Sequence, residues 1–403
     1  MSKFDKYFLM NIDDIIEYTL EKLPNMNWDK ESMKAVEIGD GNLNYVFKVW
    51  DNNGNSVIIK HAGEALRISE QMKVSTDRNR IESEILLIEE TYAKGMVPHI
   101  YFYDTIMCAC GMEDLSDYKL MRYALMEQEI FPKFAKDIAE FMFNTLLKTS
   151  DVVMEHKAKK ELVKKFISPE LCEITENLVL MEPYNDINKQ NSFTKQNEEF
   201  VKKELYEDEA LILEVAKLKF EFMTKAQALI HGDLHTGSIF VKQDSTKVFD
   251  PEFAFYGPMG YDIGNVIANL IFAYGKGLEK ENNEFCDWIL KTITEIIDIF
   301  INEYNENFEK IATEPMAKVK GFKEYYLDDI LKDTASYAGT ELHRRTVGMA
   351  KVKDLTSIEN EDTRAFTERL DILCGKDYIL NSSNFKNGVA FAKAVLKARA
   401  DAE

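Results

Sequence analysis

The chain has few cysteines, and their spacing argues against the two common uses of that residue. Five cysteines occur in 403 residues, an odd number, and one Cys-Ala-Cys run is their closest pairing. Cys108 and Cys110 fall in an apolar run of strand-like sequence. Because alternate strand residues share a face, we expect packed thiols there rather than metal ligands or a disulfide. A reducing cytoplasm is the compartment that best fits this usage.

Positive charge is also scarce. With 50 Lys and Arg against 70 Asp and Glu, the net charge is −20, which repels phosphate backbones and anionic bilayers. Continuous apolar runs stay short of the roughly 18 residues of a membrane span. The first ten residues mix Lys3, Asp5 and Lys6 with apolar side chains, unlike a signal peptide. We therefore expect neither nucleic acid nor a membrane as a partner.

What is present is enough apolar sequence for two folded domains, with 45% hydrophobic and 11% aromatic residues. The pattern predicts a helix over residues 12–23, a hairpin over 45–60, a helix over 77–94, strands over 100–103 and 106–110, and a polar connector over 111–117. Helical patterns dominate beyond it, apart from strand-like runs between 228 and 253. We predict an α+β chain with a small N-terminal lobe over 1–115, built on an antiparallel sheet, and a larger, mainly helical lobe over 116–403.

The strongest functional signal lies in that strand-like segment. Residues 231–235, His-Gly-Asp-Leu-His, form a polar loop between two such runs, and residues 250–252, Asp-Pro-Glu, follow one hairpin later. Phosphoryl transfer needs one carboxylate to orient the attacking hydroxyl and others to hold magnesium against the phosphates. We predict these roles for Asp233 and for Asp250 with Glu252, the alternative being that Asp233 only caps a turn. The two histidines suit hydrogen bonding to the loop better than a zinc pair.

Nucleotide contacts are predicted in the N-terminal lobe. The glycines of residues 37–45, Glu-Ile-Gly-Asp-Gly-Asn-Leu-Asn-Tyr, allow backbone amides to approach phosphates. Lys60 ends the next strand, where a kinase places the lysine that contacts the α- and β-phosphates; the alternative is a surface lysine. Glu82 or Glu84 on the following helix would pair with it. Residues 112–115, Met-Glu-Asp-Leu, would form a hinge whose backbone binds the adenine edge.

Taken together, these motifs resemble those of the methylthioribose kinases, a family within the aminoglycoside-phosphotransferase-like group of the protein-kinase-like superfamily. The resemblance is in the turn with Asn44, the hinge, residues 231–238 (His-Gly-Asp-Leu-His-Thr-Gly-Ser) and residues 250–264 (Asp-Pro-Glu-Phe-Ala-Phe-Tyr-Gly-Pro-Met-Gly-Tyr-Asp-Ile-Gly). It extends over nearly the whole chain. Ser238 is the most specific residue, because the wider group generally has asparagine there.

The resemblance implies a bilobal kinase that transfers the γ-phosphoryl group of ATP, with Mg²⁺, to the 1-hydroxyl of S-methyl-5-thioribose. The products would be S-methyl-5-thioribose 1-phosphate and ADP, in methionine salvage, and the enzyme would be a homodimer. The implied roles are catalysis and sugar contact for Asp233, nucleotide binding for Asn44, Lys60, Glu113, Asp114, Leu115, Asp250, Pro251 and Glu252, magnesium binding for Asp250 and Glu252, and sugar binding for Arg344 and Arg345.

Alternatives remain at the substrate. Met72 and Lys73 stand where the family usually has Trp-Pro, in a loop expected to close over the sugar. An Arg-Arg pair such as Arg344 and Arg345 is, by itself, more typical of a solvated helix face. The alternative functions are a kinase for an aminoglycoside, a choline-like amine or another pentose, and a nucleotide-binding regulator without catalysis. Paired arginines disfavour cationic acceptors, and the joint presence of the lysine and the three carboxylates disfavours the regulator.

Overall fold

The computed structural model of the chain describes residues 2–38, 44–63, 65–66, 69–73 and 78–403, with the backbone alone for 65–66 and 69–73. The predicted glycine turn at 39–43 and the side chains of Met72 and Lys73 therefore lie outside the described part. The chain forms two compact units. The first contains Met1–Tyr118 with Lys247–Ala254, and the second contains Lys119–Thr246 with Phe255–Glu403.

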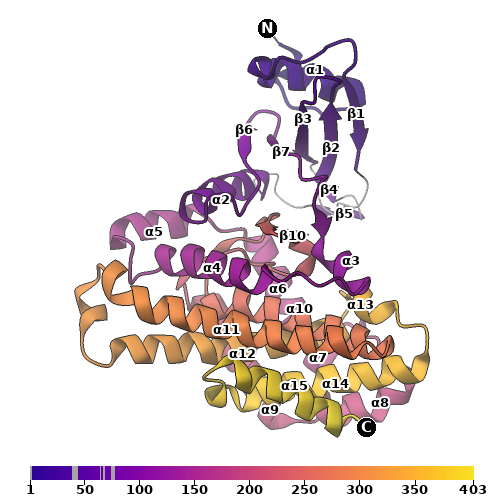
Figure 1. Cartoon of the computed structure of the whole chain (residues 1–403), viewed down its shortest axis with the longest axis vertical. Coiled ribbons are helices and arrows are strands. Elements are labelled where there is room, and N and C mark those ends of the chain that lie inside the picture. The colour runs from indigo at the N-terminus through magenta and orange to yellow at the C-terminus, as the bar shows by residue number, and fades with distance from the viewer. Residues whose placement is uncertain (1, 39–43, 64, 67–68, 74–77) are drawn as a thin grey trace. The chain divides into compact units, whose positions relative to one another are not determined.

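The first unit is built on a five-stranded antiparallel sheet in the order β1-β2-β3-β7-β6, shown in indigo and purple in Figure 1. Its elements are η1 (Lys3–Asp5), α1 (Ile12–Lys22), η2 (Pro24–Met26), β1 (Lys34–Glu37), β2 (Asn44–Trp50), β3 (Ser56–Ala62), the pair β4 (Ala65–Leu66) and β5 (Ser69–Lys73), α2 (Arg78–Tyr92), β6 (Ile100–Asp104) and β7 (Ala109–Glu113). Helix α1 packs on β1 and β2, and α2 packs on β3, β6 and β7.

Helix α1 illustrates how the sequence fixes its own local structure. Asn11 accepts hydrogen bonds from the backbone N–H groups of Asp13 and Asp14, and the Asp14 side chain bonds back to Asn11, which forms a capping box. The helix ends before Pro24, which begins a 3₁₀ turn. Its buried face contributes Ile15 and Tyr18 to a core completed by apolar residues of β2, β3 and β7. Strand β3, which carries Lys60, contributes Val57 and Ile59 to this core.

The strand predicted over residues 106–110 is displaced in the structure. Asp104 accepts hydrogen bonds from the backbone N–H groups of Ile106 and Met107, so residues 105–108 form a turn. Cys108 lies in that turn with a φ of 48°, while Cys110 is buried in β7, so the expectation that the two thiols share a strand face was wrong. Strand β7 (Ala109–Glu113) instead includes the first three residues of the predicted connector.

The second unit is mainly helical, with short strands around the predicted catalytic loop. Its strands are β8 (Lys119–Leu120), β9 (Ala228–Ile230), β10 (Ile239–Lys242), β11 (Ser245–Val248), which runs on into the first unit, and β12 (Phe255–Gly257). Its helices are α3 (Met121–Met126), α4 (Phe134–Leu146), α5 (His156–Lys165), α6 (Pro169–Leu178), α7 (Glu182–Asn185), α8 (Glu198–Val201), α9 (Glu209–Thr224), α10 (Met259–Glu279), α11 (Asn283–Ile311), α12 (Phe322–Thr346), α13 (Lys353–Thr356), α14 (Glu361–Leu380) and α15 (Gly388–Asp401). Helix α10 packs on α11, α12 and α14.

Two glycines in α10 let it approach α12 closely. A Cβ atom built on Gly264 would lie 2.6 Å from the backbone nitrogen of Ala338 and 2.7 Å from the carbonyl oxygen of Thr334. One turn earlier, a Cβ atom built on Gly260 would lie 2.5 Å from the backbone nitrogen of Thr334. The contact brings the helix that follows the predicted magnesium residues against the helix that ends in Arg344 and Arg345.

We expect Gly264→Ala to lower the free energy of unfolding by about 1–3 kcal/mol, because the methyl group would collide with backbone that cannot rotate away. Gly275→Ala in the same helix is the control, since its Cβ would meet the Thr367 side chain instead. Urea unfolding of both variants measures the difference. Equal stability losses for the two would contradict the close-approach explanation.

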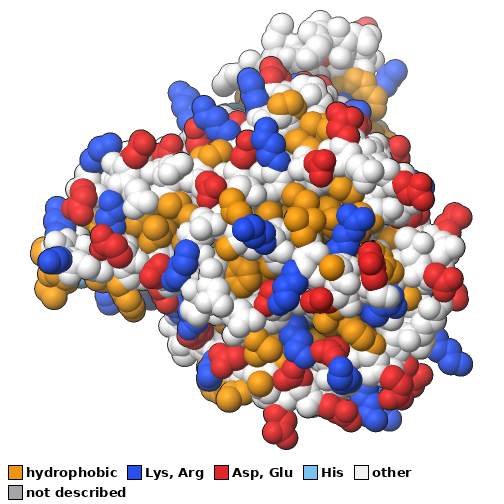
Figure 2. Space-filling model, turned by 60° about the horizontal axis from the view of Figure 1, so that its bottom comes forward, with side chains coloured by type: hydrophobic (Ala, Val, Ile, Leu, Met, Phe, Trp, Pro, Cys, Tyr) orange, Lys and Arg blue, Asp and Glu red, His pale blue; other side chains and the backbone are white. Residues whose placement is uncertain are grey.

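The predicted fold class is confirmed: the chain is α+β, with an antiparallel sheet in its N-terminal unit and a second unit built mainly of helices. Within the described residues, no helix is both long enough and apolar enough to cross a membrane. On the face shown in Figure 2, acidic and basic side chains are interspersed, with apolar side chains between them.

Candidate functional site

In the first unit, a buried cluster of charged groups surrounds Lys60. Its side chain comes from β3, is 7% exposed, and forms ion pairs with Asp250 and with Glu82, the Nζ to Oε2 distance to Glu82 being 2.7 Å. Burial would lower the pKa of Lys60, but the two carboxylates raise it well above its usual value. Lys60 is therefore a charged residue held inside the unit, and the alternative of a surface lysine is wrong.

The structure distinguishes the two candidate partners on α2. Glu82 is buried and points to Lys60, whereas Glu84 is partly exposed and pairs with Arg80 at 3.2 Å. The two glutamates are two residues apart, about 200° around a helix, so they lie on nearly opposite faces. Burial raises the pKa of Glu82 despite its ion pair with Lys60.

Glu252 is held by a chain of polar side chains that begins at α2. The Asn44 amide donates to Glu252 Oε2 at 3.2 Å, and Arg78 Nε donates to Asn44 Oδ1 at 3.0 Å. Burial and the neighbouring Asp250 raise the pKa of Glu252 well above its usual value. The sequence prediction included Asn44 and Glu252 but not Arg78. Arg78 lies at the start of the predicted helix over 77–94, and its charge gives no sign in the sequence that its side chain is buried.

Asp250 and Glu252 form a carboxylate pair whose chemistry fits a divalent cation. Carboxylate oxygens are the ligands that Mg²⁺ prefers, and the mutual repulsion of the buried Glu252 carboxylate and the partly exposed Asp250 carboxylate favours a cation beside them. Asp250 has a φ of 69°, an unusual conformation for a residue other than glycine and more so before a proline. This backbone geometry at the strand end is the kind of local strain that functional sites retain.

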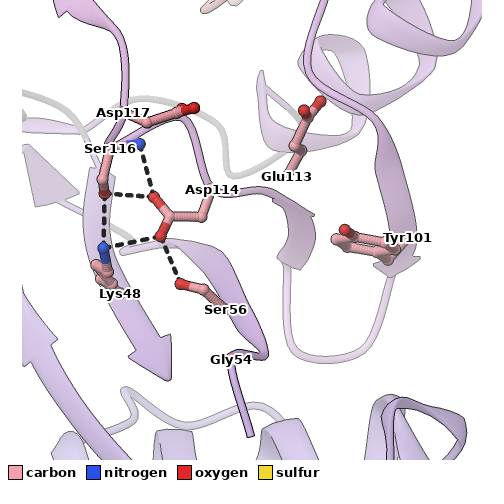
Figure 3. Close-up of a pocket in the computed structure, with 8 residues that line it drawn as sticks. All are labelled: Lys48, Gly54, Ser56, Tyr101, Glu113, Asp114, Ser116 and Asp117. Atoms are coloured by element: carbon pink, nitrogen blue, oxygen red, sulfur yellow. Dashed lines mark hydrogen bonds and ion pairs between the residues drawn. The ribbon is translucent and has the colours of Figure 1, made fainter. Parts of the chain in front are cut away.

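The predicted hinge lies at the end of β7, beside the open pocket shown in Figure 3. The Asp114 carboxylate accepts hydrogen bonds from the Ser56 and Ser116 hydroxyls and pairs with Lys48 at 2.8 Å. Glu113 pairs with Lys247 at 2.7 Å, and its backbone N–H donates to the His99 carbonyl. The acidic side chains of the hinge therefore make structural contacts, so only its backbone is left as a candidate for adenine.

In the second unit, the loop after β9 is shaped by an aspartate from α10. Asp262 accepts hydrogen bonds from the backbone N–H groups of His231 at 2.7 Å and Gly232 at 3.0 Å. Burial raises the pKa of Asp262 to about 6. Gly232 has a φ of 80°, which a side chain would disfavour, and this turn directs the next residue, Asp233, away from the strand.

Asp233 is flanked by positive or proton-bearing groups. Its Oδ2 lies 3.3 Å from His235 Nε2, and its Oδ1 lies 3.6 and 3.7 Å from the terminal nitrogens of Arg344 and Arg345. Burial would raise the pKa of Asp233, but the histidine and the two arginines lower it well below its ordinary value. The carboxylate is therefore ionised at neutral pH, as a group that orients a hydroxyl must be.

The two arginines are anchored by a single buried glutamate. Glu341, which is fully buried, accepts a hydrogen bond from Nε of Arg344 and another, at 3.0 Å, from Nε of Arg345. The arginine side chains are only 11% and 10% exposed. The alternative of a solvated helix face is therefore wrong. Burial would raise the pKa of Glu341, but the arginines lower it, so it stays charged.

Two residues near Asp233 lay outside the sequence prediction. Glu341 precedes the arginines by three and four residues, and this helical spacing indicates that its side chain can pair with both. Arg122 gave none: it lies in α3, where it donates to Thr236 Oγ1 at 3.3 Å and to Asn269 Oδ1 at 3.0 Å. Only the folded chain brings Arg122 to the predicted catalytic loop.

Comparison with known proteins points the same way. A family profile described as "Phosphotransferase enzyme family" matches residues 184–284. A methylthioribose kinase of Escherichia coli O45:K1 (strain S88 / ExPEC) is 36% identical over 89% of each chain. That of Geobacillus thermodenitrificans (strain NG80-2) is 40% identical over 87% of this chain and 88% of its own.

Among solved structures, an ethanolamine kinase of Plasmodium vivax is 15% identical with a TM-score of 0.46, covering 99% of this chain and 91% of its own. A glucosamine kinase in complex with glucosamine, ADP and inorganic phosphate is 10% identical with a TM-score of 0.46, covering 89% and 82%. Sequence identity above a third, sustained along nearly the whole length of the two relatives, decides the family. This chain belongs to the methylthioribose kinases.

Proposed function

We propose that this protein phosphorylates the 1-hydroxyl of S-methyl-5-thioribose, with ATP as phosphoryl donor and Mg²⁺ as the accompanying ion, in methionine salvage. The observation that supports this most is the state of Asp233, an ionised carboxylate fixed between His235 and two arginines. A carboxylate so held suits a hydroxyl nucleophile, since it can orient the hydroxyl and receive its proton.

The proposed roles follow the two groups of residues. Lys60, held by Glu82, contacts the nucleotide phosphates, and Asn44 orients Glu252. Asp250 and Glu252, with Pro251 between them, would hold Mg²⁺, which neutralises charge on the phosphates when bound. The backbone of residues 113–115, Glu-Asp-Leu, binds the adenine edge. Arg344 and Arg345 bind the sugar and stabilise negative charge on the transferred group.

The rate gain is expected to come mainly from alignment and charge stabilisation, because phosphoryl transfer requires little covalent chemistry from the protein. Arg344 and Arg345 do two things at Asp233. They keep its carboxylate ionised, and they place fixed positive charge within 4 Å of it, at 3.6 and 3.7 Å from Oδ1. A cationic acceptor would be repelled by these arginines, which favours a neutral sugar over choline-like amines and aminoglycosides.

The test is steady-state ADP release with magnesium-ATP and methylthioribose, run beside ribose, choline and kanamycin, with Asp233→Ala as the blank. Selective turnover of methylthioribose is the expected result. Release of ADP with one of the other acceptors alone would retain the kinase and reject the substrate. Tight ATP binding without turnover on any acceptor would favour a nucleotide-binding regulator. Sedimentation of the same preparation tests the proposed homodimer.

Glu82→Gln should lower kcat by about tenfold to a hundredfold, because the buried Lys60 loses one of the two carboxylates that position its ammonium group. Glu84→Gln is a matched control, two residues along the same helix on its more exposed side, and should leave turnover unchanged. Both variants are assayed at saturating methylthioribose with varied ATP. Similar losses in the two would remove Glu82 from its proposed role.

A further inference from the structure

His235 lies between the two halves of the catalytic loop and contacts both. On one side, its Nε2 is 3.3 Å from Asp233 Oδ2. On the other, its Nδ1 accepts a hydrogen bond from the backbone N–H of Gly237 at 3.0 Å and lies 3.4 Å from the Ser238 hydroxyl. The ring therefore connects the carboxylate to the turn that begins the next strand.

The contacts at Nδ1 determine where the ring proton is. A backbone N–H can only donate, so Nδ1 must present a lone pair to Gly237. In a neutral imidazole the other nitrogen then bears the proton, so Nε2 donates to Asp233. A protonated, cationic ring would have N–H facing N–H at Gly237 and would lose that hydrogen bond.

The surroundings keep the ring in this state and in this place. A Cβ on Gly237 would lie 2.7 Å from His235 Cε1, so the backbone at 237 is packed directly against the ring. Arg122 approaches the same point, since that Cβ would lie 3.5 Å from its Cζ, and it holds Thr236 by a hydrogen bond. Burial and the charges of Arg122 and Arg345 outweigh the opposing effect of Asp233 and lower the pKa of His235, so the ring is neutral at pH 7.

We propose that His235 is a positioning residue for phosphoryl transfer, locked as the neutral Nε2–H tautomer and donating to Asp233 Oδ2. It fixes the plane of the carboxylate from one side while Arg344 and Arg345 face Oδ1 from the other. The Asp233 carboxylate therefore faces the hydroxyl of the acceptor in a single orientation. This inference rests on the proposed catalytic role of Asp233.

Two substitutions separate the contacts of the ring. In His235→Gln, the amide nitrogen reaches the place of Nε2 and can still donate to Asp233. In His235→Asn, the shorter side chain reaches only the place of Nδ1, so it can accept from Gly237 but leaves Asp233 without its donor. We expect kcat to fall about a hundredfold in the asparagine variant and to stay within about tenfold of wild type in the glutamine variant. The KM for magnesium-ATP and the melting temperature should be similar in both.

Nitrogen-15 spectra of the imidazole rings give a readout independent of turnover. The His235 signals, assigned by their loss in either variant, should show an unprotonated Nδ1 and a protonated Nε2 at pH 7. Equal kcat values for the two variants, or a protonated Nδ1, would overturn the proposal. Asp233→Asn in the same assay identifies the source of a failure. If Asp233→Asn retains turnover, the proposed catalytic site is wrong. If Asp233→Asn abolishes turnover but neither His235 variant lowers it, the site stands and only the proposed role of His235 is wrong.

Discussion

Asp233→Asn is expected to lower kcat by about a thousandfold while leaving nucleotide affinity unchanged. An amide has nearly the same size as the carboxylate but cannot receive the hydroxyl proton. It also loses the negative charge that His235, Arg344 and Arg345 surround. The nucleotide residues belong to a different group of side chains, so ATP binding has no reason to weaken. Single-turnover kinetics for the chemical step and calorimetry for ATP measure the two quantities separately.

Asp244→Asn is the control for this variant, because Asp244 is an exposed aspartate in the hairpin between β10 and β11, the strands that follow the loop of Asp233. It should behave as wild type in both measurements. If Asp233→Asn kept more than about a tenth of the wild-type kcat, the carboxylate would be a structural group, and the proposed reaction would need another residue to orient the acceptor.

The second large effect is expected from Glu341→Gln, which should lower the free energy of unfolding by about 3 kcal/mol. Gln keeps the volume of the side chain, but it removes the negative charge that accepts hydrogen bonds from Nε of both arginines. The two buried cations then keep Asp233 as a shared partner, at 3.6 and 3.7 Å, and leaving buried charge without its full compensation costs more than the original ion pair contributes. The KM for methylthioribose should rise as well, because the arginines are no longer held in place.

Urea unfolding at neutral pH measures the stability change, with Glu306→Gln on the exposed side of α11 as the control. The control removes one glutamate charge of the same chain without touching a buried pair, and surface changes of this kind are usually within about 0.5 kcal/mol. A loss in Glu341→Gln no larger than in the control would show that the arginines are held by other contacts.

Much of the fold was predictable because local signals agree with the tertiary structure. The capping box at Asn11 and Pro24 bound the first helix, and turn residues bound the hairpin of β2 and β3. The strand over 106–110 failed because one side chain, that of Asp104, bonds to the following backbone and converts apolar sequence into a turn. The hydrophobic pattern alone does not show that a side chain competes with the strand for these backbone N–H groups.

Some residues of the candidate site could be predicted from the sequence, and others could not. Asp233, Asp250 and Lys60 could be named from motifs, because their chemistry and spacing are both restrictive, although their roles stay predictions. The choice between Glu82 and Glu84 needed the structure, since both fit the motif and only the helical face distinguishes them. Arg122 could not be found at all, because its contacts with Thr236 and Asn269 join residues more than a hundred positions apart.

The assignment of residues 247–254 to the first unit has a consequence for how the chain is made. Because Asp250 and Glu252 reach this unit only after a long excursion through the other one, the polypeptide passes between the two units three times. During synthesis from the N-terminus, the sheet of the first unit emerges well before Asp250, the second of the two carboxylates that pair with Lys60. In a fragment that ends near residue 118, Lys60 would pair with Glu82 alone. The N-terminal unit therefore cannot be exchanged between proteins as one continuous segment of the chain.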